Sequence, residues 1–239
     1  NNDEYMADIG AALPPGTYYY ASRFNVFNGD YVYGGFNGGF WNGTSNVSGI
    51  LTVTPKIITL WNRSVADTTL PTWFGTNNER GFAYGFIPSS PTETGNHRLF
   101  VVNRTGGLFV RIINAETGVD VGELNTTGIT GGAIALNDVE VSKDGVIFGS
   151  NVTTNAVTTP FKIYMWANET AAPVEVFSYT STEATRLGDL FTVVGDYTAG
   201  TAQIWAASGT GSANGKVYKW TMGGMPTFNP VPEIITLSD

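Results

Sequence analysis

The sequence predicts an all-β fold, a β-propeller-like protein of four four-stranded antiparallel blades with an N-terminal arm. Short runs of alternating apolar and polar residues, the period of a half-buried strand, fill most of the chain. Glycine, asparagine and aspartate separate these runs, as hairpin turns require. A unit of four runs recurs, which is typical of blades that bury their faces against neighbouring blades. A β-sandwich is the alternative architecture.

The repeating unit is clearest from residue 137 to residue 179. Residues 138–141 alternate, and Asp144-Gly145 predicts a hairpin turn because glycine reaches positive φ without steric cost. The return strand is expected at 146–150, the third strand at 161–166 and the fourth at 174–179. We therefore expect a four-stranded antiparallel blade with short polar turns.

Three further blades are expected at 18–61, 80–124 and 189–237. Their strands are predicted at 18–25, 30–36, 50–53 and 56–61; at 80–87, 98–103, 108–114 and 119–124; and at 189–194, 203–207, 216–222 and 233–237. The fourth strands of the first and last blades nearly match in sequence, as Pro55–Leu60 and Pro232–Leu237. They are separated by three units of about 59 residues, a period longer than that of common blades.

Residues 1–16 do not alternate, so we expect an N-terminal arm there, either extended or with a short helix over 3–12, and one domain over 17–239. Four blades are the lower limit for a closed propeller. An open ring would expose sheet faces and edges, which a partner protomer could cover. The arm could also cover them by adding a strand to a neighbour's sheet.

The composition excludes several classes of protein. The net charge is −8 and only 13% of residues are charged, so no basic surface is available to bind nucleic acid. The chain has no cysteine, hence no disulfide and no thiolate metal site. No apolar run approaches the roughly 20 residues of a membrane span. The chain does not begin with methionine, which suggests a processed or trimmed N-terminus.

Asn-X-Ser/Thr sequons favour an extracellular or cell-surface location, because glycans attach to such sites in secreted proteins. Each sequon falls in a predicted turn or at the end of a predicted strand, where a glycan has room. The alternative is that asparagine and threonine are there simply as turn formers. The candidate glycosylation sites are Asn42, Asn46, Asn62, Asn103, Asn125, Asn151 and Asn168.

Several segments resemble a family of secreted bacterial and archaeal proteins known as domain of unknown function 4623. The resembling segments are Leu60–Val65, Leu70–Gly75, Glu79–Gly85, Leu136–Ser142, Pro160–Tyr164, Gly188–Val193 and Val217–Trp220. They span roughly residues 55–222. The resemblance implies a propeller-like fold and an extracellular setting. It implies no catalytic residues.

Two pairs of carboxylates are candidates for glycosidase chemistry, which uses two such groups. Asp138 and Glu140 share one face of a strand, and Asp189 with Asp196 is the second pair. The stronger interpretation is that Asp138 and Glu140 form the polar face of their strand. His97, the one histidine, lies in a polar stretch without the G-x-S-x-G motif of a serine hydrolase, which favours a solvated loop position. We therefore predict no enzymatic activity.

No cofactor is predicted, although structural calcium is an alternative. Asp144, Asp196 and Glu116 lie in predicted loops rich in oxygen atoms, as calcium prefers, but no EF-hand motif is present.

Exposed aromatic residues are the remaining candidates for binding. Phe36, Phe40 and Trp41 lie in a glycine-rich loop, whereas Trp73 and Phe74 are expected to fill the seam between the first two blades. The interface candidates are Tyr5, Met6, Phe40 and Trp41.

Together these features predict a non-enzymatic extracellular structural protein that self-assembles as a filament or surface-layer subunit. Low charge suits a protein packed against copies of itself, and repeated head-to-tail contacts generate filaments when they do not close. A secreted carbohydrate-binding propeller, with a glycan as partner, is the first alternative. A glycan-active hydrolase that uses Asp138 and Glu140 is the second.

Overall fold

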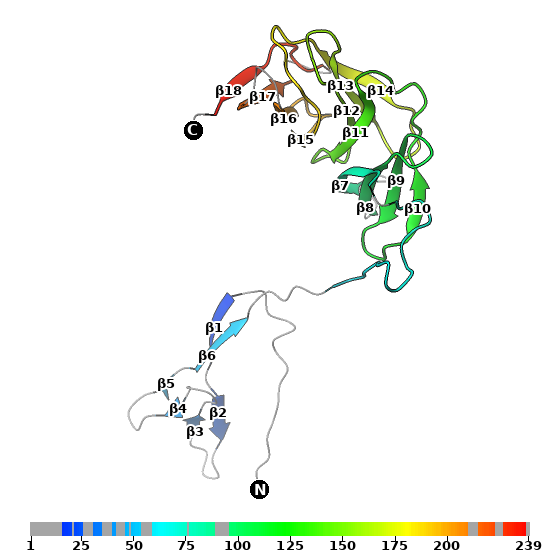
Figure 1. Ribbon diagram of the computed structural model, residues 1–239. Helices are drawn as coiled ribbons and strands as arrows, with labels where there is room; N and C mark the ends of the chain where they lie inside the picture. The colour runs from blue at the N-terminus through cyan, green and yellow to red at the C-terminus, as the bar shows by residue number, and fades with distance from the viewer. Residues whose placement is uncertain are drawn as a thin grey trace. The chain divides into compact units, whose positions relative to one another are not determined.

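A computed structural model describes residues 16–20, 22–25, 31–34, 40–41, 46–47, 49–53, 59–75, 77–88, 96–209, 215–222 and 227–237, the first six ranges as backbone alone. Contacts within the chain separate two compact units, residues 1–59 and 60–239. The sequence pattern instead predicted one domain over 17–239. Over the described ranges the fold is all-β and contains no helix, and so none that could cross a membrane (Figure 1).

The first unit forms paired strands in place of the predicted four-stranded sheet. Its strands are β1 (Gly16–Tyr20), β2 (Ser22–Asn25), β3 (Tyr31–Gly34), β4 (Phe40–Trp41), β5 (Asn46–Val47) and β6 (Gly49–Val53). β1 pairs with β6, β2 with β3, and β4 with β5. The strand predicted at 18–25 is thus two strands with different partners. β1 pairs with the last strand of the unit, β6, and the other four strands lie between them in the sequence. In a blade each strand pairs instead with the next one in the chain.

The second unit begins with a four-stranded antiparallel sheet in the predicted place. Its strands are β7 (Glu79–Ile87), β8 (Asn96–Asn103), β9 (Phe109–Asn114) and β10 (Asp120–Glu123). The residues of β7 alternate between exposed and buried from Phe82 to Ile87, as the period of a half-buried strand requires. His97 lies within β8 and stacks on Tyr84 of β7, with ring centroids 5.7 Å apart. The predicted solvated loop position of His97 is therefore wrong, because β8 begins one residue before it.

The second sheet of this unit is the predicted blade at 137–179. Its strands are β11 (Ile134–Val141), β12 (Ile147–Val152), β13 (Phe161–Trp166) and β14 (Val174–Tyr179). The Asp144-Gly145 turn joins β11 to β12, and Gly145 adopts a φ of 84° that a residue with a side chain seldom adopts. The ladder pairs Val141 with Ile147. The hairpin prediction is confirmed.

The third sheet also follows the expected order. Its strands are β15 (Phe191–Val194), β16 (Gln203–Ala207), β17 (Lys216–Thr221) and β18 (Glu233–Thr236). Each strand lies within a predicted range. We refer to the sheets β7–β10, β11–β14 and β15–β18 as sheets 1, 2 and 3.

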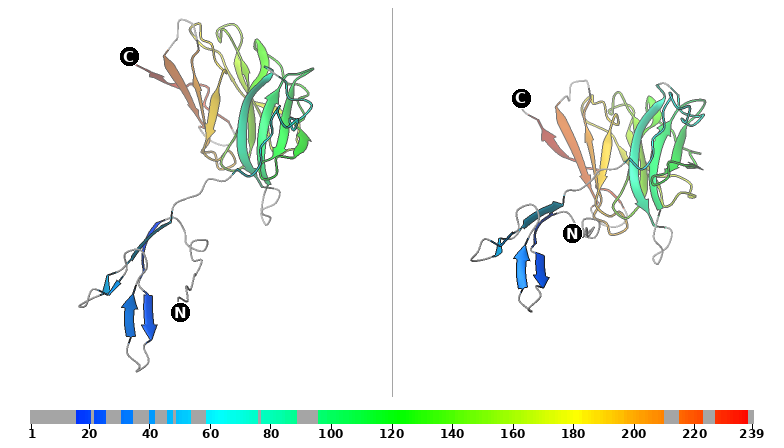
Figure 2. Two further views of the ribbon diagram at one scale, coloured as in Figure 1. Left: turned by 60° about the horizontal axis from the view of Figure 1, so that its bottom comes forward. Right: turned by 90° about the horizontal axis from the view of Figure 1, so that it is seen from below.

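The three sheets are arranged around their first strands. β11 lies beside β7 on one side and β15 on the other, and the views of Figures 1 and 2 show the sheets following one another in chain order. One apolar core joins sheets 1 and 2 and includes Phe100, Val110 and Trp166. A second core joins sheets 2 and 3 and includes Phe148 and Trp220. Sheet 2 is therefore covered on both faces.

The segment 60–75 packs along the outer strands of sheet 1. Trp61 Nε1 donates a hydrogen bond to the Ala115 carbonyl over 2.8 Å, and Trp73 Nε1 donates one to Asp120 Oδ2 over 2.5 Å. The guanidinium of Arg111 lies over the Trp73 ring, 5.6 Å from its centroid. Trp73 thus covers β9 and β10, and its role in a seam with residues 18–61 stays a prediction. Phe74 is exposed.

Candidate functional site

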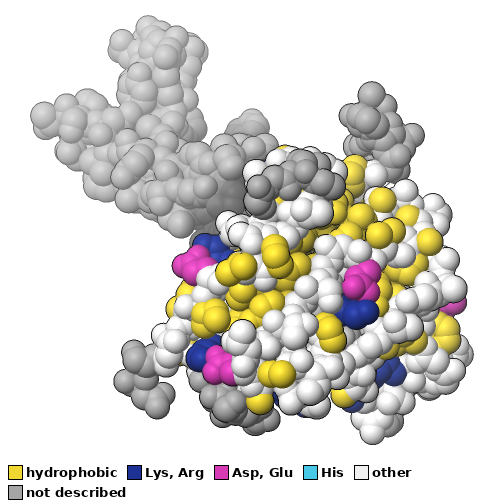
Figure 3. Space-filling model, turned by 90° about the horizontal axis from the view of Figure 1, so that it is seen from above, with side chains coloured by type: hydrophobic (Ala, Val, Ile, Leu, Met, Phe, Trp, Pro, Cys, Tyr) yellow, Lys and Arg dark blue, Asp and Glu magenta, His cyan; other side chains and the backbone are white. Residues whose placement is uncertain are grey.

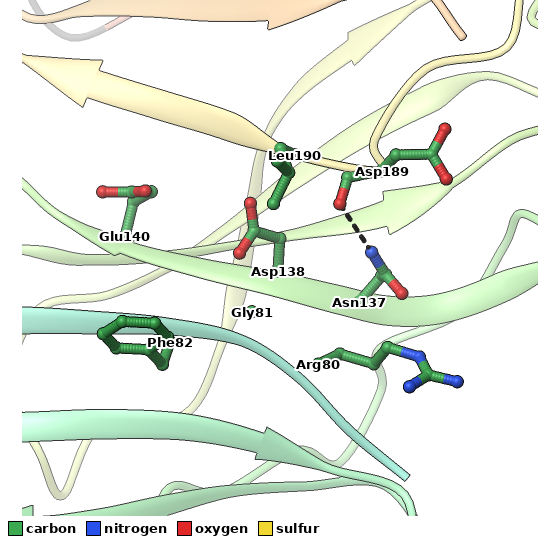
Figure 4. A pocket seen from close by; sticks show the side chains of 8 residues that line it. All are labelled: Arg80, Gly81, Phe82, Asn137, Asp138, Glu140, Asp189 and Leu190. Carbon is green, nitrogen blue, oxygen red and sulfur yellow. Dashed lines mark hydrogen bonds between the residues drawn. The ribbon is translucent and has the colours of Figure 1, made fainter. Parts of the chain in front are cut away.

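A cavity of about 330 Å³ lies where the first strands of the three sheets meet (Figure 4). The lining comes from the start of β7, the middle and second half of β11 and the two residues before β15. The lining residues are Arg80, Gly81, Phe82, Asn137, Asp138, Glu140, Asp189 and Leu190.

Asp138 ties sheet 2 to sheet 3. Its side chain is buried, with Oδ2 accepting a hydrogen bond from the Phe191 amide over 2.9 Å and Oδ1 accepting one from the Val139 amide over 3.0 Å. Asn137 reinforces the junction, because its Nδ2 donates to the carbonyl oxygens of Gly188 at 3.1 Å and Asp189 at 3.0 Å. Asp138 and Asn137 therefore both bind backbone groups at the start of sheet 3, and both carboxylate oxygens of Asp138 are already occupied.

Gly81 of sheet 1 lies against Asp138, on the strand β7 that packs beside β11. A Cβ atom built on Gly81 would lie 1.6 Å from Asp138 Oδ1 and 2.6 Å from the Asp138 Cα. Such contacts are impossible without moving β7 away from β11. Glycine is thus needed at position 81 for the close approach of the two strands.

The two carboxyl groups of β11 are difficult to ionise. Burial raises the pKa of Asp138 from 3.8 to about 6, although hydrogen bonds from Phe191 and Val139 act in the opposite direction. Burial, and then the nearby charge of Asp138, raise the pKa of Glu140 from 4.5 to about 7. At neutral pH the pair therefore carries less than two negative charges. Perturbed carboxyl groups in a cavity mark a candidate binding site.

The second predicted carboxylate pair is not brought together. Asp189 lines the cavity before β15 and forms an ion pair with Arg186, whose Nε lies 2.6 Å from Asp189 Oδ2. Asp196 follows β15 and lies 3.4 Å from the Lys143 ammonium. The two residues thus occupy opposite ends of one strand.

Asp144, a calcium candidate, forms a link between sheets 2 and 3. Its carboxylate accepts hydrogen bonds from Ser142 Oγ at 2.6 Å, the Tyr197 amide at 3.0 Å, and the amide and hydroxyl of Thr198 at 2.8 and 2.6 Å. Burial raises its pKa, but these hydrogen bonds outweigh burial and lower the pKa to about 2. In the described part of the chain no group of three or more acidic or histidine side chains could hold a metal ion. Structural calcium stays an untested alternative.

The predicted sequons divide into buried and exposed sites. Asn103 and Asn151 are fully buried, and their Nδ2 atoms donate hydrogen bonds to Glu79 Oε1 at 2.8 Å and the Pro160 carbonyl at 3.0 Å. The folded protein leaves no room for a glycan on either, so these two site predictions are wrong. Both side chains close turns between strands, which is the turn-forming role weighed above. Asn62, Asn125 and Asn168 are exposed.

Several predicted residues lie where the structure gives no side chain. Tyr5, Met6, Phe36 and Asn42 lie outside the described residues, and for Phe40, Trp41 and Asn46 only the backbone of β4 and β5 is described. Their interface and glycosylation roles stay predictions.

Sequence reasoning missed an exposed aromatic row on β7. Phe82 is 69% exposed, Tyr84 57% and Phe86 43%. The row alternates with Ala83 and Gly85, which face sheet 2, where a Cβ on Gly85 would lie 2.5 Å from Val141 Cγ1. The signal was present in the sequence: small residues on one face of a strand indicate close packing there, and large residues on the other face need a different partner.

Comparison with known proteins supports this fold. No protein-family profile matches the chain, and no curated protein does. A solved structure of a DUF4623 family protein from Bacteroides eggerthii aligns with 98% of this chain at a TM-score of 0.55 and 16% identity. The chain resembles the DUF4623 family in fold. It spans about half the length of that protein, since the alignment covers 50% of the longer chain.

Proposed function

We propose that this protein is a non-enzymatic, extracellular structural protein that self-assembles, as a subunit of a filament or a surface layer. The observation that carries the proposal is the aromatic row of Phe82, Tyr84 and Phe86, exposed on a strand whose other face is buried. Contiguous exposed apolar surface on a sheet marks an interaction site. On the face that Figure 3 shows, hydrophobic side chains reach the surface and charged side chains are few. Few charges oppose the close approach of identical copies.

A propeller-like architecture accounts for the arrangement of the sheets. Sheets 1, 2 and 3 share one strand order, and their first strands meet at the cavity. In a propeller the first strand of each blade lines the centre and the fourth forms the rim. The exposure of β10 and β18 supports this assignment.

Self-assembly is tested on the secreted protein by negative-stain electron microscopy with light scattering. We expect regular fibres, sheets or closed oligomers from the wild type. Tyr84→Glu places a charge in the aromatic row and should abolish assembly without unfolding the sheet, because position 84 is exposed. Val231→Glu, at a site 72% exposed on the loop before β18, is the matched control and should assemble normally. A wild-type protein that stays monomeric at all concentrations would exclude the proposal.

The extracellular location is supported by three sequons that the fold leaves open, Asn62, Asn125 and Asn168. Intact-mass and peptide mass spectrometry of material from the native source should find glycans on one or more of them and none on Asn103 or Asn151. Occupancy of either buried site would contradict the fold, and a complete lack of glycan would remove this support for the location.

Carbohydrate binding at the cavity is the second candidate function. It is favoured by Phe82, whose ring can stack on a sugar face at a cavity that Glu140 also lines. Calorimetric titration with oligosaccharides should then give an affinity that Phe82→Ala removes. Hydrolysis by Asp138 and Glu140 is less well supported, because both oxygens of Asp138 accept backbone hydrogen bonds. Turnover of a glycan that Asp138→Asn abolishes would overturn this judgement.

A further inference from the structure

Each sheet of the second unit has a face toward the following sheet, its front, and a face toward the preceding sheet, its back. The front of sheet 1 packs on the back of sheet 2 in one apolar core, and the front of sheet 2 packs on the back of sheet 3 in the other. Among residues 60–75, 77–88, 96–209, 215–222 and 227–237, no sheet covers the back of sheet 1 or the front of sheet 3. Within these described residues, two different faces of one repeating interface are therefore left without a covering sheet.

The back of sheet 1 is apolar next to the cavity. It presents Phe82, Tyr84 and Phe86 on β7, all exposed. Trp73 and the Arg111 guanidinium already cover its outer strands. The uncovered part of this face thus runs along β7. The equivalent first strands of sheets 2 and 3, β11 and β15, each contact the preceding sheet at this place.

The front of sheet 3 contains a residue equivalent to two core residues. In sheet 1, Phe100 lies three residues before Asn103; in sheet 2, Phe148 lies three residues before Asn151; both phenylalanines are fully buried at a sheet–sheet interface. Trp205 of sheet 3 lies three residues before Ser208 but is only partly buried.

Hydrogen bonds show that Asn151 of sheet 2 and Ser208 of sheet 3 are equivalent in structure as well as in sequence spacing. The Lys162 amide donates to Asn151 Oδ1 over 2.8 Å, and the Lys216 amide donates to Ser208 Oγ over 3.1 Å. Asn151 and Ser208 thus serve the same turn in consecutive sheets. Trp205 therefore occupies the place of a core aromatic residue whose covering sheet is not among the described residues.

The first strands give a register for the missing contact. Gly81, Asp138 and Leu190 line the cavity at equivalent places. Counting from them, Val194 corresponds to Gly85, and Tyr84 corresponds to Val141. A Cβ on Gly85 would touch Val141, so these two positions face each other across the interface between sheets 1 and 2. Val194 is 53% exposed and Tyr84 57%, as expected of two positions that lack this partner.

We propose that a second copy of this chain supplies the missing sheet, with the front of sheet 3 in one copy packed on the back of sheet 1 in the next. This inference rests on the proposed self-assembly and identifies its surfaces. It is supported by the exposed positions Tyr84 and Val194, which are equivalent to the pair Val141 and Gly85 that face each other between sheets 1 and 2. The contact joins two different surfaces, so repeating it gives a closed ring or an open filament.

Disulfide cross-linking tests the contact, and the chain contains no cysteine that would interfere. Tyr84→Cys and Val194→Cys are purified separately under reducing conditions, mixed, allowed to assemble and oxidised. The cross-linked dimer is expected in the mixture and not with either variant alone. Val157→Cys, 42% exposed in the loop between β12 and β13, is the control and should cross-link with neither.

Three other results of the cross-linking experiment would each contradict a different part of the proposal. If the wild type and both cysteine variants assemble but the mixture gives no dimer, the two faces are not the interface, while self-assembly stands. Cross-linking of Tyr84→Cys with itself would instead indicate a symmetric contact between two copies of sheet 1. If the wild type does not assemble, the proposed function fails before the surfaces are tested.

Discussion

Replacing Glu140 by glutamine should stabilise the protein above pH 7 and flatten its stability between pH 5 and 7. Glu140 lines the cavity beside Asp138, and burial followed by the Asp138 charge raises its pKa from 4.5 to about 7. Between these two pH values the folded protein binds the proton more tightly than the unfolded chain. The free energy of unfolding therefore falls as pH rises through this window and stays at its lower value above it.

The size of the effect follows from the pKa. A rise from 4.5 to about 7 corresponds to ~3 kcal/mol if the whole shift is expressed, at about 1.4 kcal/mol per pH unit. Water reaches part of the carboxyl group and screens it, which reduces the expected gain to ~1–2 kcal/mol at pH 8. At pH 4.5 the variant and the wild type should be nearly equally stable. Asp138 keeps its own raised pKa in the variant, so a smaller decline should remain below about pH 6.

Urea unfolding followed by tryptophan fluorescence measures this, because Trp166 and Trp220 are fully buried and report on the two cores. Glu116→Gln is the matched control, since it removes the same charge from an exposed turn. An unchanged decline between pH 5 and 7 in Glu140→Gln would contradict this prediction, as would a variant that is less stable than the wild type at pH 8.

Two more predictions concern links between sheets, and a third concerns the segment 60–75. Gly81→Ala should lower the free energy of unfolding by about 2 kcal/mol or more, because its Cβ would collide with the Asp138 backbone; a loss below ~0.5 kcal/mol in thermal unfolding would contradict this. Asp144→Ala should cost ~2 kcal/mol at pH 7, because it removes the hydrogen bonds that the charged carboxylate accepts from Ser142 and Thr198. Since the Asp144 pKa is lowered to about 2, the wild type should lose this advantage as pH falls from 4 to 2, so the two unfolding curves should converge. Trp61→Ala should release the segment 60–75 from the turn between β9 and β10 and accelerate its cleavage in limited proteolysis, whereas an unchanged cleavage rate would show that the Trp61 hydrogen bond is dispensable.

Sequence patterns predicted the twelve strands of sheets 1, 2 and 3 closely because these sheets are local structures. Each strand pairs with its neighbour in the chain, and turn residues such as Asp144-Gly145 mark where the chain reverses. Strands β13, β14 and β16 begin and end at the predicted residues. The first unit was predicted less well because β1 pairs with β6, and no local pattern distinguishes that pairing from a blade.

Prediction of the site was partial for a related reason. Asp138 and Glu140 were recognised as sharing a face, since that follows from strand geometry alone. Their raised pKa values, the hydrogen bond from Phe191 to Asp138 and the glycine contact at Gly81 all depend on three sheets that meet at one point. Sequence alone does not reveal such a meeting.

Sequon motifs show the same limit. Asn103 and Asn125 both match the glycosylation pattern, yet one is fully buried and the other exposed. A three-residue motif carries no information about the packing of distant residues.

The sequence by itself determined the strand order, the hairpin turns and the repeat of a four-strand unit, because these depend on residues close together in the chain. Only the tertiary structure decided which faces of the sheets are covered. Burial depends on residues from different sheets, as when Val141 of β11 fills the space beside Gly85 of β7. For the same reason, only the structure revealed that Tyr84 and Trp205 stand at equivalents of covered positions without a covering sheet among the described residues.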